Sequence, residues 1–220
     1  MLQSLCVRLA LVVLVSICGT GCAERPPPPV PNQTAAYWVL KRGGKLAVDV
    51  NGESRRVANL SELPRDGFIV REIDLEGIAD LPAGGLSELA HLRPLRKLSL
   101  RKSGVTNDGL DKLAGLNSLE NLDVSATSIT DDALPAIGRF THLKVLDLSG
   151  TKVCGSGLKH LQPCWKMTDL RLSDTLLESQ YLASLKSFHN LTKLDVAKTS
   201  VSDTAVQDLA TALKYCPIQR

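Results

Sequence analysis

Apolar residues return at a spacing of 24 residues through more than half of this chain. Within each unit, three apolar positions follow one another at intervals of three and then two residues. A fixed period of this kind is typical of a solenoid, in which each unit stacks on the next because none can bury its apolar face alone. The three columns are Leu95, Leu119, Leu143, Met167 and Leu191; Leu98, Leu122, Leu146, Leu170 and Leu194; and Leu100, Val124, Leu148, Leu172 and Val196.

Each unit has the pattern of a short strand, a turn and a short helix. The segment 122–124 alternates between apolar and polar residues, which predicts a strand with Asp123 facing solvent. Thr130 precedes two aspartates and is typical of a helix start, after which Leu134 and Ile137 would form the inward stripe of a convex-side helix. A column of hydroxyl residues lies between strand and helix, and we expect it to hydrogen-bond the backbone there. This column contains Ser103, Thr127, Thr151, Thr175 and Thr199.

The units resemble leucine-rich repeats of the pattern LxxLxLxxTxITDxGLxxLxxL, and residues 119–140 are the clearest copy. Five units cover residues 95–213, and a sixth, with one extra residue, includes Ile73 and Leu75 as its strand. The resemblance implies an α/β solenoid: a right-handed superhelix in the form of a horseshoe arc, with about six repeats and a small N-terminal α/β cap. It says little about function, because similar repeats occur in F-box adaptors of ubiquitin ligases and in many bacterial envelope proteins.

Residues 1–21 have the pattern of a secretory signal peptide. Arg8 precedes an apolar run over residues 9–17 that is too short to cross a membrane. Gly21-Cys22 is similar to the cleavage site of bacterial lipoproteins, which implies a lipid on Cys22, although Gly19 stands where that site usually has a larger apolar residue. Plain export to the periplasm or medium is the alternative, with Cys22 an ordinary small residue of the cleavage region. An export signal argues against a cytosolic adaptor.

Two further segments separate the signal peptide from the repeats. Residues 22–33 are rich in proline and predict a stiff, extended tether. Residues 34–70 predict a cap, which consists of a helix over 34–42 and a hairpin around the favoured turn sequence Asn51-Gly52. A solenoid exposes an apolar flank at its end, which such a cap would cover. Residues 71–220 would then form the repeat domain.

The sequence contains no recognisable catalytic or metal-binding motif. The four histidines fall at different repeat phases, and there is no nucleophile elbow, H-E-x-x-H sequence, glycine-rich phosphate loop or C-x-x-C pair. We therefore expect neither enzymatic activity nor a cofactor or metal. The net charge of +3 argues against nucleic acid as a partner.

Three cysteines follow the signal region. Cys164 falls in an apolar column, where a free thiol behaves as a small hydrophobic group. A bridge between Cys154 and Cys164 is one alternative, although the helix between them tends to hold the sulfurs apart. An odd count of three leaves at least one thiol unpaired within the chain.

The exposed face of the predicted strands is the candidate binding surface. Its centre is mildly acidic, so a basic loop or peptide, or a hydroxyl-rich glycan, would fit along it. A solvated face without a ligand is the alternative, and the lack of aromatic residues there lowers the expectation of a tight complex. We predict a protein- or peptide-binding module displayed in the bacterial cell envelope; a structural envelope protein that self-associates is the alternative, and the oligomeric state stays open. The candidate residues are Asp74, Lys97, Arg101, Asn121, Asp123, Asp147, Asp169, Arg171, Lys193 and Asp195.

Overall fold

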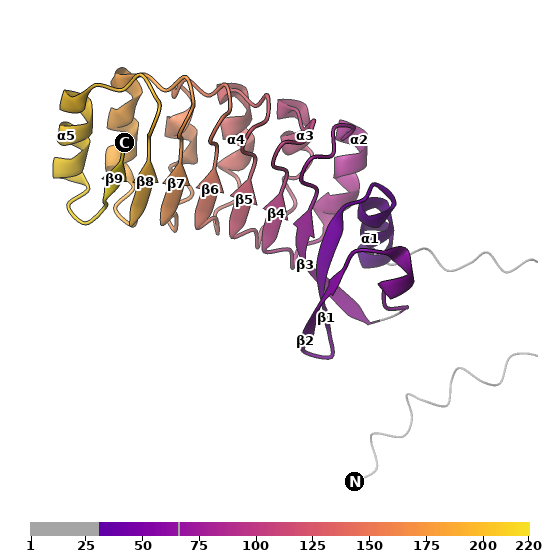
Figure 1. Cartoon of the computed structure of the whole chain (residues 1–220). Helices are drawn as coiled ribbons and strands as arrows, with labels where there is room; N and C mark the ends of the chain where they lie inside the picture. Colours follow the sequence, from indigo (N-terminus) through magenta and orange to yellow (C-terminus); the bar gives the residue numbers. More distant parts are fainter. Residues whose placement is uncertain (1–30, 66) are drawn as a thin grey trace, which may run out of the picture.

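The computed structural model describes residues 31–65 and 67–220, and these form one curved row of coils (Figure 1). The predicted signal peptide, the predicted lipid site Cys22 and residues 22–30 of the predicted tether lie outside the described residues. Among the helices that the structure describes, none has the length and apolar character needed to span a bilayer.

The first described element is the helix α1 (Pro31–Lys41). It begins three residues before the predicted start at Thr34, so residues 31–33 are helical rather than part of the tether. Proline is tolerated in the first turn of a helix, where the backbone N–H has no partner within the helix. The partly buried Trp38 of this helix packs against the apolar core, and a Cβ at Gly85 would lie 2.5 Å from its ring.

A hairpin follows the helix and joins the cap to the repeats. The strands β1 (Lys45–Val50) and β2 (Glu53–Val57) pair antiparallel around Asn51 and Gly52, whose φ angles are 53° and 88°. Two positive φ angles are the geometry of a tight hairpin turn that matches the twist of its strands. The short 3-10 helix η1 (Leu60–Glu62) leads from the hairpin toward the repeats.

One continuous sheet runs through the molecule in the order β2-β1-β3-β4-β5-β6-β7-β8-β9. From β3 to β9 every pairing is parallel and in a constant register, so that Leu98, Leu122 and Leu146 lie side by side. This arrangement confirms the predicted α/β solenoid. The seven strands are β3 (Phe68–Asp74), β4 (Lys97–Ser99), β5 (Asn121–Asp123), β6 (Val145–Asp147), β7 (Asp169–Arg171), β8 (Lys193–Asp195) and β9 (Ile218–Gln219).

The strand β3 belongs to both the cap and the repeats. Over its whole length it pairs antiparallel with β1, and its last three residues also pair in parallel with β4. The boundary predicted between residues 70 and 71 therefore falls inside one strand, and Leu75 lies just beyond that strand. The sequence pattern missed this because the repeat period begins only near the end of β3.

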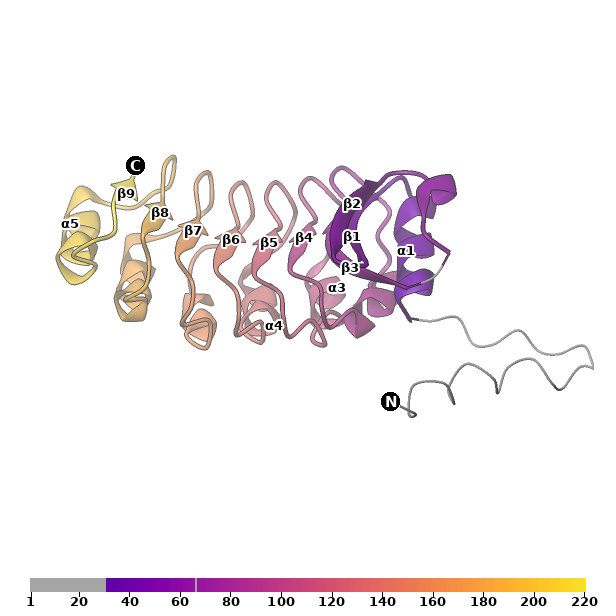
Figure 2. The ribbon, with the colours of Figure 1, turned by 90° about the horizontal axis from the view of Figure 1, so that it is seen from below.

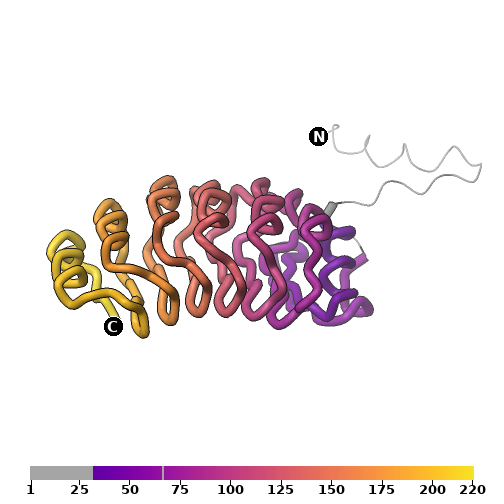
Figure 3. Tube along the Cα trace, turned by 90° about the horizontal axis from the view of Figure 1, so that it is seen from above, coloured from indigo at the N-terminus to yellow at the C-terminus, as the bar shows by residue number. Residues whose placement is uncertain are grey.

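Short helices cover the opposite side of the sheet (Figures 2 and 3). Several are 3-10 turns, and the helix starts at Thr106, Thr130 and Ser202 are capped by the side-chain oxygen, as predicted for Thr130. The core lies between these helices and the sheet, and its inward residues in β4 to β8 are at most 1% exposed. The helices are α2 (Ala83–Leu86), η2 (Ser87–His91), α3 (Asn107–Asp111), η3 (Asp131–Ala133), α4 (Leu134–Ile137), η4 (Leu158–Leu161), η5 (Ser179–Ser187) and α5 (Asp203–Ala212).

The hydroxyl column has the role predicted for it. Each of its five side chains donates a hydrogen bond of 2.6 to 2.7 Å to the carbonyl oxygen three residues earlier, where the chain leaves the strand. One residue before each hydroxyl, the backbone takes a left-handed conformation. The φ angles there are 52° at Lys102, 54° at Ala126, 68° at Gly150, 55° at Asp174 and 57° at Lys198.

Candidate binding surface on the strand face

The constant register arranges the outward side chains in two rows that cross the sheet. The central row begins at Lys45 of the hairpin and ends at Gln219, and the side row begins at Arg56 and ends at Lys193. The hairpin thus extends the surface that the repeats present. The central row consists of Lys45, Asp74, Ser99, Asp123, Asp147, Arg171, Asp195 and Gln219, and the side row consists of Arg56, Ala47, Glu72, Lys97, Asn121, Val145, Asp169 and Lys193.

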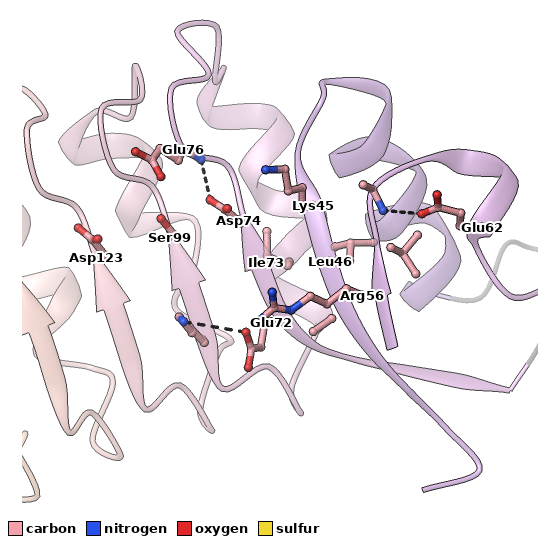
Figure 4. Close-up of a pocket in the computed structure, with 14 residues that line it drawn as sticks. Lys45, Leu46, Arg56, Glu62, Glu72, Ile73, Asp74, Glu76, Ser99 and Asp123 are labelled. Atoms are coloured by element: carbon pink, nitrogen blue, oxygen red, sulfur yellow. Dashed lines mark hydrogen bonds and ion pairs between the residues drawn. The ribbon is translucent and has the colours of Figure 1, made fainter. Parts of the chain in front are cut away.

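A hollow of about 540 Å³ lies where the hairpin meets the first repeats (Figure 4). The hairpin contributes Lys45 and Arg56 to its lining, and the repeats contribute Asp74 and Asp123 among others. We call this the cap hollow. Its position follows from the pairing of β1 with β3, because that pairing brings two cationic side chains of the cap beside the acidic residues of the repeats.

A second hollow of about 280 Å³ continues along the same face toward β7. It is lined by Asn121, Asp147 and Arg171, and it shares Lys97 and Asp123 with the cap hollow. We call it the repeat hollow. Because two lining residues are common to both, the hollows adjoin, and Asp123 lies at their junction.

Most cations of the repeats already have a partner on this face. Lys97 lies 4.0 Å from Glu72, and Arg101 lies 3.4 Å from Glu76. Arg171 contacts Asp169 at 2.9 Å and Asp147 at 3.3 Å. The side chains of these two aspartates are only 17% and 13% exposed, so water screens this cluster weakly. The hydrogen bond with Asp169 is the main cause that raises the pKa of Arg171.

The aspartates of the central row have a second, structural role. Asp123 accepts hydrogen bonds from the backbone N–H of Ser125 at 2.9 Å and from its hydroxyl at 2.6 Å. The same oxygen of Asp74, Asp147 and Asp195 accepts the N–H two residues later, at 2.9 to 3.0 Å. Aspartate is favoured in such turns because its side chain can close them. Part of the acidic character of this face therefore stabilises the turns that end the strands.

The structure divides the predicted site residues into two groups. Asp74, Lys97, Asn121, Asp123, Asp147 and Arg171 line the hollows. Arg101, Asp169, Lys193 and Asp195 lie outside both linings, and Arg101 comes just after β4 beside Glu76. Sequence reasoning missed Lys45 and Arg56, because the turn sequence Asn51-Gly52 indicated a hairpin but not its position beside the repeats.

A half-buried carboxylate away from the strand face binds backbone N–H groups. Asp131 accepts hydrogen bonds from the N–H groups of Cys154, Gly155 and Gly157 at 2.7, 3.0 and 2.7 Å. Burial tends to raise the pKa of Asp131, but the hydrogen bonds, those from Gly157 and Cys154 foremost, outweigh burial and leave the pKa below its ordinary value. This contact joins one repeat to the next.

The cysteines do not form the bridge considered from the sequence. Cys154, Cys164 and Cys216 are all free thiols in the described part of the chain. The helix η4 separates Cys154 from Cys164, and the sulfur of Cys164 lies 3.4 Å from the carbonyl oxygen of Phe140. Burial raises the pKa of Cys164 to about 11, so its thiol is protonated at neutral pH. Residues 31–65 and 67–220 hold no group of three His, Cys, Asp or Glu side chains placed to bind a metal ion.

Comparisons with known proteins agree with this architecture. A sequence model of the family described as "Leucine Rich repeat" matches residues 91–114 and 141–161. The structure is similar to that of an internalin C2 from Listeria monocytogenes, with a TM-score of 0.52, 24% identity, and coverage of 60% of this chain and 54% of that one. It is also similar to a leucine-rich repeat protein from Leptospira interrogans, with a TM-score of 0.55, 22% identity, and coverage of 68% of this chain and 37% of that one.

The matched region spans about half of the length of the first of these proteins and less of the second. At these identities the likeness concerns the fold. Comparison with curated protein sequences gives no match.

Proposed function

We infer that this chain, which is a leucine-rich repeat protein, acts as a protein-interaction module that binds its ligand on the strand face and catalyses no reaction. The observation that carries the inference is the pair of adjoining hollows on two rows of outward side chains. None of the four histidines belongs to either row. The acidic groups of the rows contact cations or the backbone, whereas Lys45, Arg56 and Lys193 have no ion-pair partner among the described residues. Such a surface recognises a ligand by shape and charge.

The size of the face favours a peptide or a protruding loop as the ligand. Nine strands at about 4.8 Å spacing make a face about 38 Å long, and the two outward rows, with the turn residues that follow the strands, make it roughly 15 Å wide. The resulting area of about 600 Å² is below the roughly 800 Å² that each partner of a standard interface buries. An extended segment needs less surface than a globular partner does.

We also propose that the module is exported and held at the bacterial envelope by a lipid on Cys22. The support is the signal-peptide pattern of residues 1–21 and the sequence Gly21-Cys22. Eight residues lie between Cys22 and the start of α1, so a lipid there would keep the cap within about 30 Å of the membrane surface.

The lipid is tested by the mass of the mature protein. The chain and its Cys22→Ala variant are expressed in a bacterium and purified from the membrane and soluble fractions. We expect a mature protein that begins at Cys22, carries the added mass of acyl chains and partitions with membranes, and we expect the variant to lose both properties. A mature chain without added mass at Cys22 would leave plain export as the explanation of the signal peptide.

The binding surface is tested by filling the cap hollow. Ser99 points outward from β4, lines this hollow and makes no side-chain hydrogen bond among the described residues. Ser99→Tyr therefore adds bulk there without breaking a contact, and Lys159→Tyr adds the same group on the exposed convex side. Chemical cross-linking in the native envelope, followed by mass spectrometry, should recover a partner with the wild type and Lys159→Tyr but not with Ser99→Tyr. Equal recovery by all three chains would exclude the strand face.

A further inference from the structure

The cap hollow contains charged side chains that form no ion pair within the described part of the chain. Lys45 and Arg56 are exposed, and neither forms an ion pair or a side-chain hydrogen bond among those residues. Asp74 and Asp123 accept hydrogen bonds from their own turns but lie in no ion pair there. The neighbouring cations Lys97, Arg101 and Arg171 differ, since each has an acidic partner.

The two unpaired cations lie at the hairpin end of the hollow, where Glu62 also lies, and Asp74 is the cross-strand neighbour of Lys45. Figure 4 shows Lys45 and Arg56 on the hairpin side of the hollow, with Asp123 on the far side beyond Ser99. The register gives the order along the central row as Lys45, Asp74, Ser99 and Asp123, one residue on each of four neighbouring strands. At about 4.8 Å per strand, this row runs from a cation to the second carboxylate over about 14 Å.

Uncharged polar groups lie between and beside these charges. Ser99 and Asn121 are half-buried, and neither side chain has a hydrogen-bond partner among residues 31–65 and 67–220. A hydroxyl and an amide can each serve as donor and as acceptor. They are therefore suited to the N–H and C=O groups of a ligand backbone that crosses the strands.

We propose that the cap hollow binds an extended peptide that carries an acidic and a basic group in a fixed order, with the acidic group over Lys45 and Arg56 and the basic group over Asp74 and Asp123. The proposal rests on the proposed function, since it specifies the ligand of the same face. Extended chain advances about 3.4 Å per residue, so the two groups are two to four residues apart. The acidic group is a side chain or the C-terminal carboxylate, because both present the same oxygens to the two cations.

The charge order distinguishes this ligand from a purely basic peptide. A peptide with only basic residues would meet Lys45 and Arg56 at one end of the hollow, where like charges repel. A glycan without charged groups would leave all four free charges of the hollow unpaired. The order of charges is thus a recognition element in addition to the shape of the face.

The test selects ligands from a library and then alters the charges of the hollow. A phage-displayed library of random 12-residue peptides is panned against the immobilised full chain, and the selected peptides are synthesised with a fluorescent label for anisotropy titrations. We expect them to share an acidic and a basic residue two to four positions apart. A control peptide of identical composition, with the two charged residues adjacent, should bind about tenfold more weakly, since it satisfies only one end of the hollow.

The protein variants remove or reverse one end of the charge order at a time. Asp123→Asn removes the charge and keeps an oxygen that can accept the N–H of Ser125, so we expect the fold to persist and the affinity to fall about fivefold. Lys45→Glu together with Arg56→Glu should weaken binding further and should select purely basic peptides when the library is panned again. Lys159→Glu changes a convex-side charge in the same way and should leave the affinity unchanged.

The outcomes separate this proposal from the function on which it rests. Selected peptides that lose binding to Ser99→Tyr but not to the charge variants would support the strand face and refute the charge order. Selected peptides that bind Ser99→Tyr as tightly as the wild type would refute both. A library from which the wild type retains no more peptide than the doubly reversed variant would also contradict the proposal.

Discussion

Each repeat has one residue in a left-handed backbone conformation. Substitutions at this position in two adjacent repeats should change the free energy of unfolding in opposite directions. Ala126 and Gly150 occupy the same position of neighbouring units, with φ angles of 54° and 68°. A Cβ on Gly150 would lie 3.5 Å from the Cα of Ala126, which is an ordinary contact. The side chain of Ala126 is exposed, so its removal costs no packing. Exchanging alanine and glycine at these two positions therefore changes the conformational energy of the backbone and leaves side-chain packing almost unchanged.

The expected magnitude follows from two opposing terms. A left-handed backbone costs an L-residue about 1 to 2 kcal/mol. Glycine avoids this cost, but part of the benefit is lost because glycine gives up about 0.5 to 1 kcal/mol more conformational freedom on folding. Ala126→Gly should therefore stabilise the protein by about 0.7 kcal/mol and raise the melting temperature by about 2 °C. Gly150→Ala should destabilise it by a similar amount.

Urea unfolding of the two variants and the wild type, followed by circular dichroism, measures both changes. Equal slopes of the free energy of unfolding against urea would show that the same surface unfolds in all three chains. A shift of the midpoint toward lower urea for Ala126→Gly, or no shift for Gly150→Ala, would refute the reasoning. The double variant should return close to the wild-type value, because the two changes have opposite signs.

Three further perturbations test contacts between and within repeats. Asp131→Ala should destabilise the protein by about 3 kcal/mol in urea unfolding, because the N–H groups of Cys154, Gly155 and Gly157 lose their shared acceptor; a loss below about 0.5 kcal/mol would show that water replaces it. Because the pKa of Asp131 is lowered in the folded chain, the ionised carboxylate stabilises the fold fully above about pH 4, and this contribution is lost as the pH falls through the lowered pKa. The loss of stability in acid should therefore be less steep for Asp131→Asn than for the wild type. Thr151→Val should cost about 1 kcal/mol in melting experiments, through the lost hydrogen bond to the carbonyl of Leu148, and a neutral result would mean that this carbonyl needs no partner.

The sequence period was sufficient to predict the solenoid and the phase of its strands. Leu122 and Val124 are buried on either side of the half-buried Asp123, because the alternation of apolar and polar residues directly reports which face of a strand is buried. The hydrogen bonds of the hydroxyl column were also predictable from the sequence, because a polar residue that recurs beside a buried column needs a hydrogen-bond partner in every repeat. These features depend on contacts within one unit or between identical units.

Other features depend on contacts that the period does not encode. The hairpin has a strong local signal at Asn51-Gly52, but its pairing with β3 is a non-local contact, and the register shift at Ala47 and Val48 has no sequence marker. The left-handed turns were also missed, because Lys102 and Ala126 are not residues that mark a positive φ. The cap hollow depends on the pairing of β1 with β3, so the presence of Lys45 and Arg56 beside the repeats could not be predicted.

The central claim is that each short strand buries one set of side chains and presents the next to a ligand. The most direct test is the thermal stability of Leu146→Asp beside that of Asp147→Asn, two adjacent residues of β6. Leu146 is fully buried, so a carboxylate there should cost more than about 4 kcal/mol or prevent folding. Asp147→Asn keeps an oxygen for the N–H of Ser149 and should cost only about 1 kcal/mol through its weakened pairing with Arg171. Equal losses for the two variants, or a larger loss for Asp147→Asn, would contradict the account.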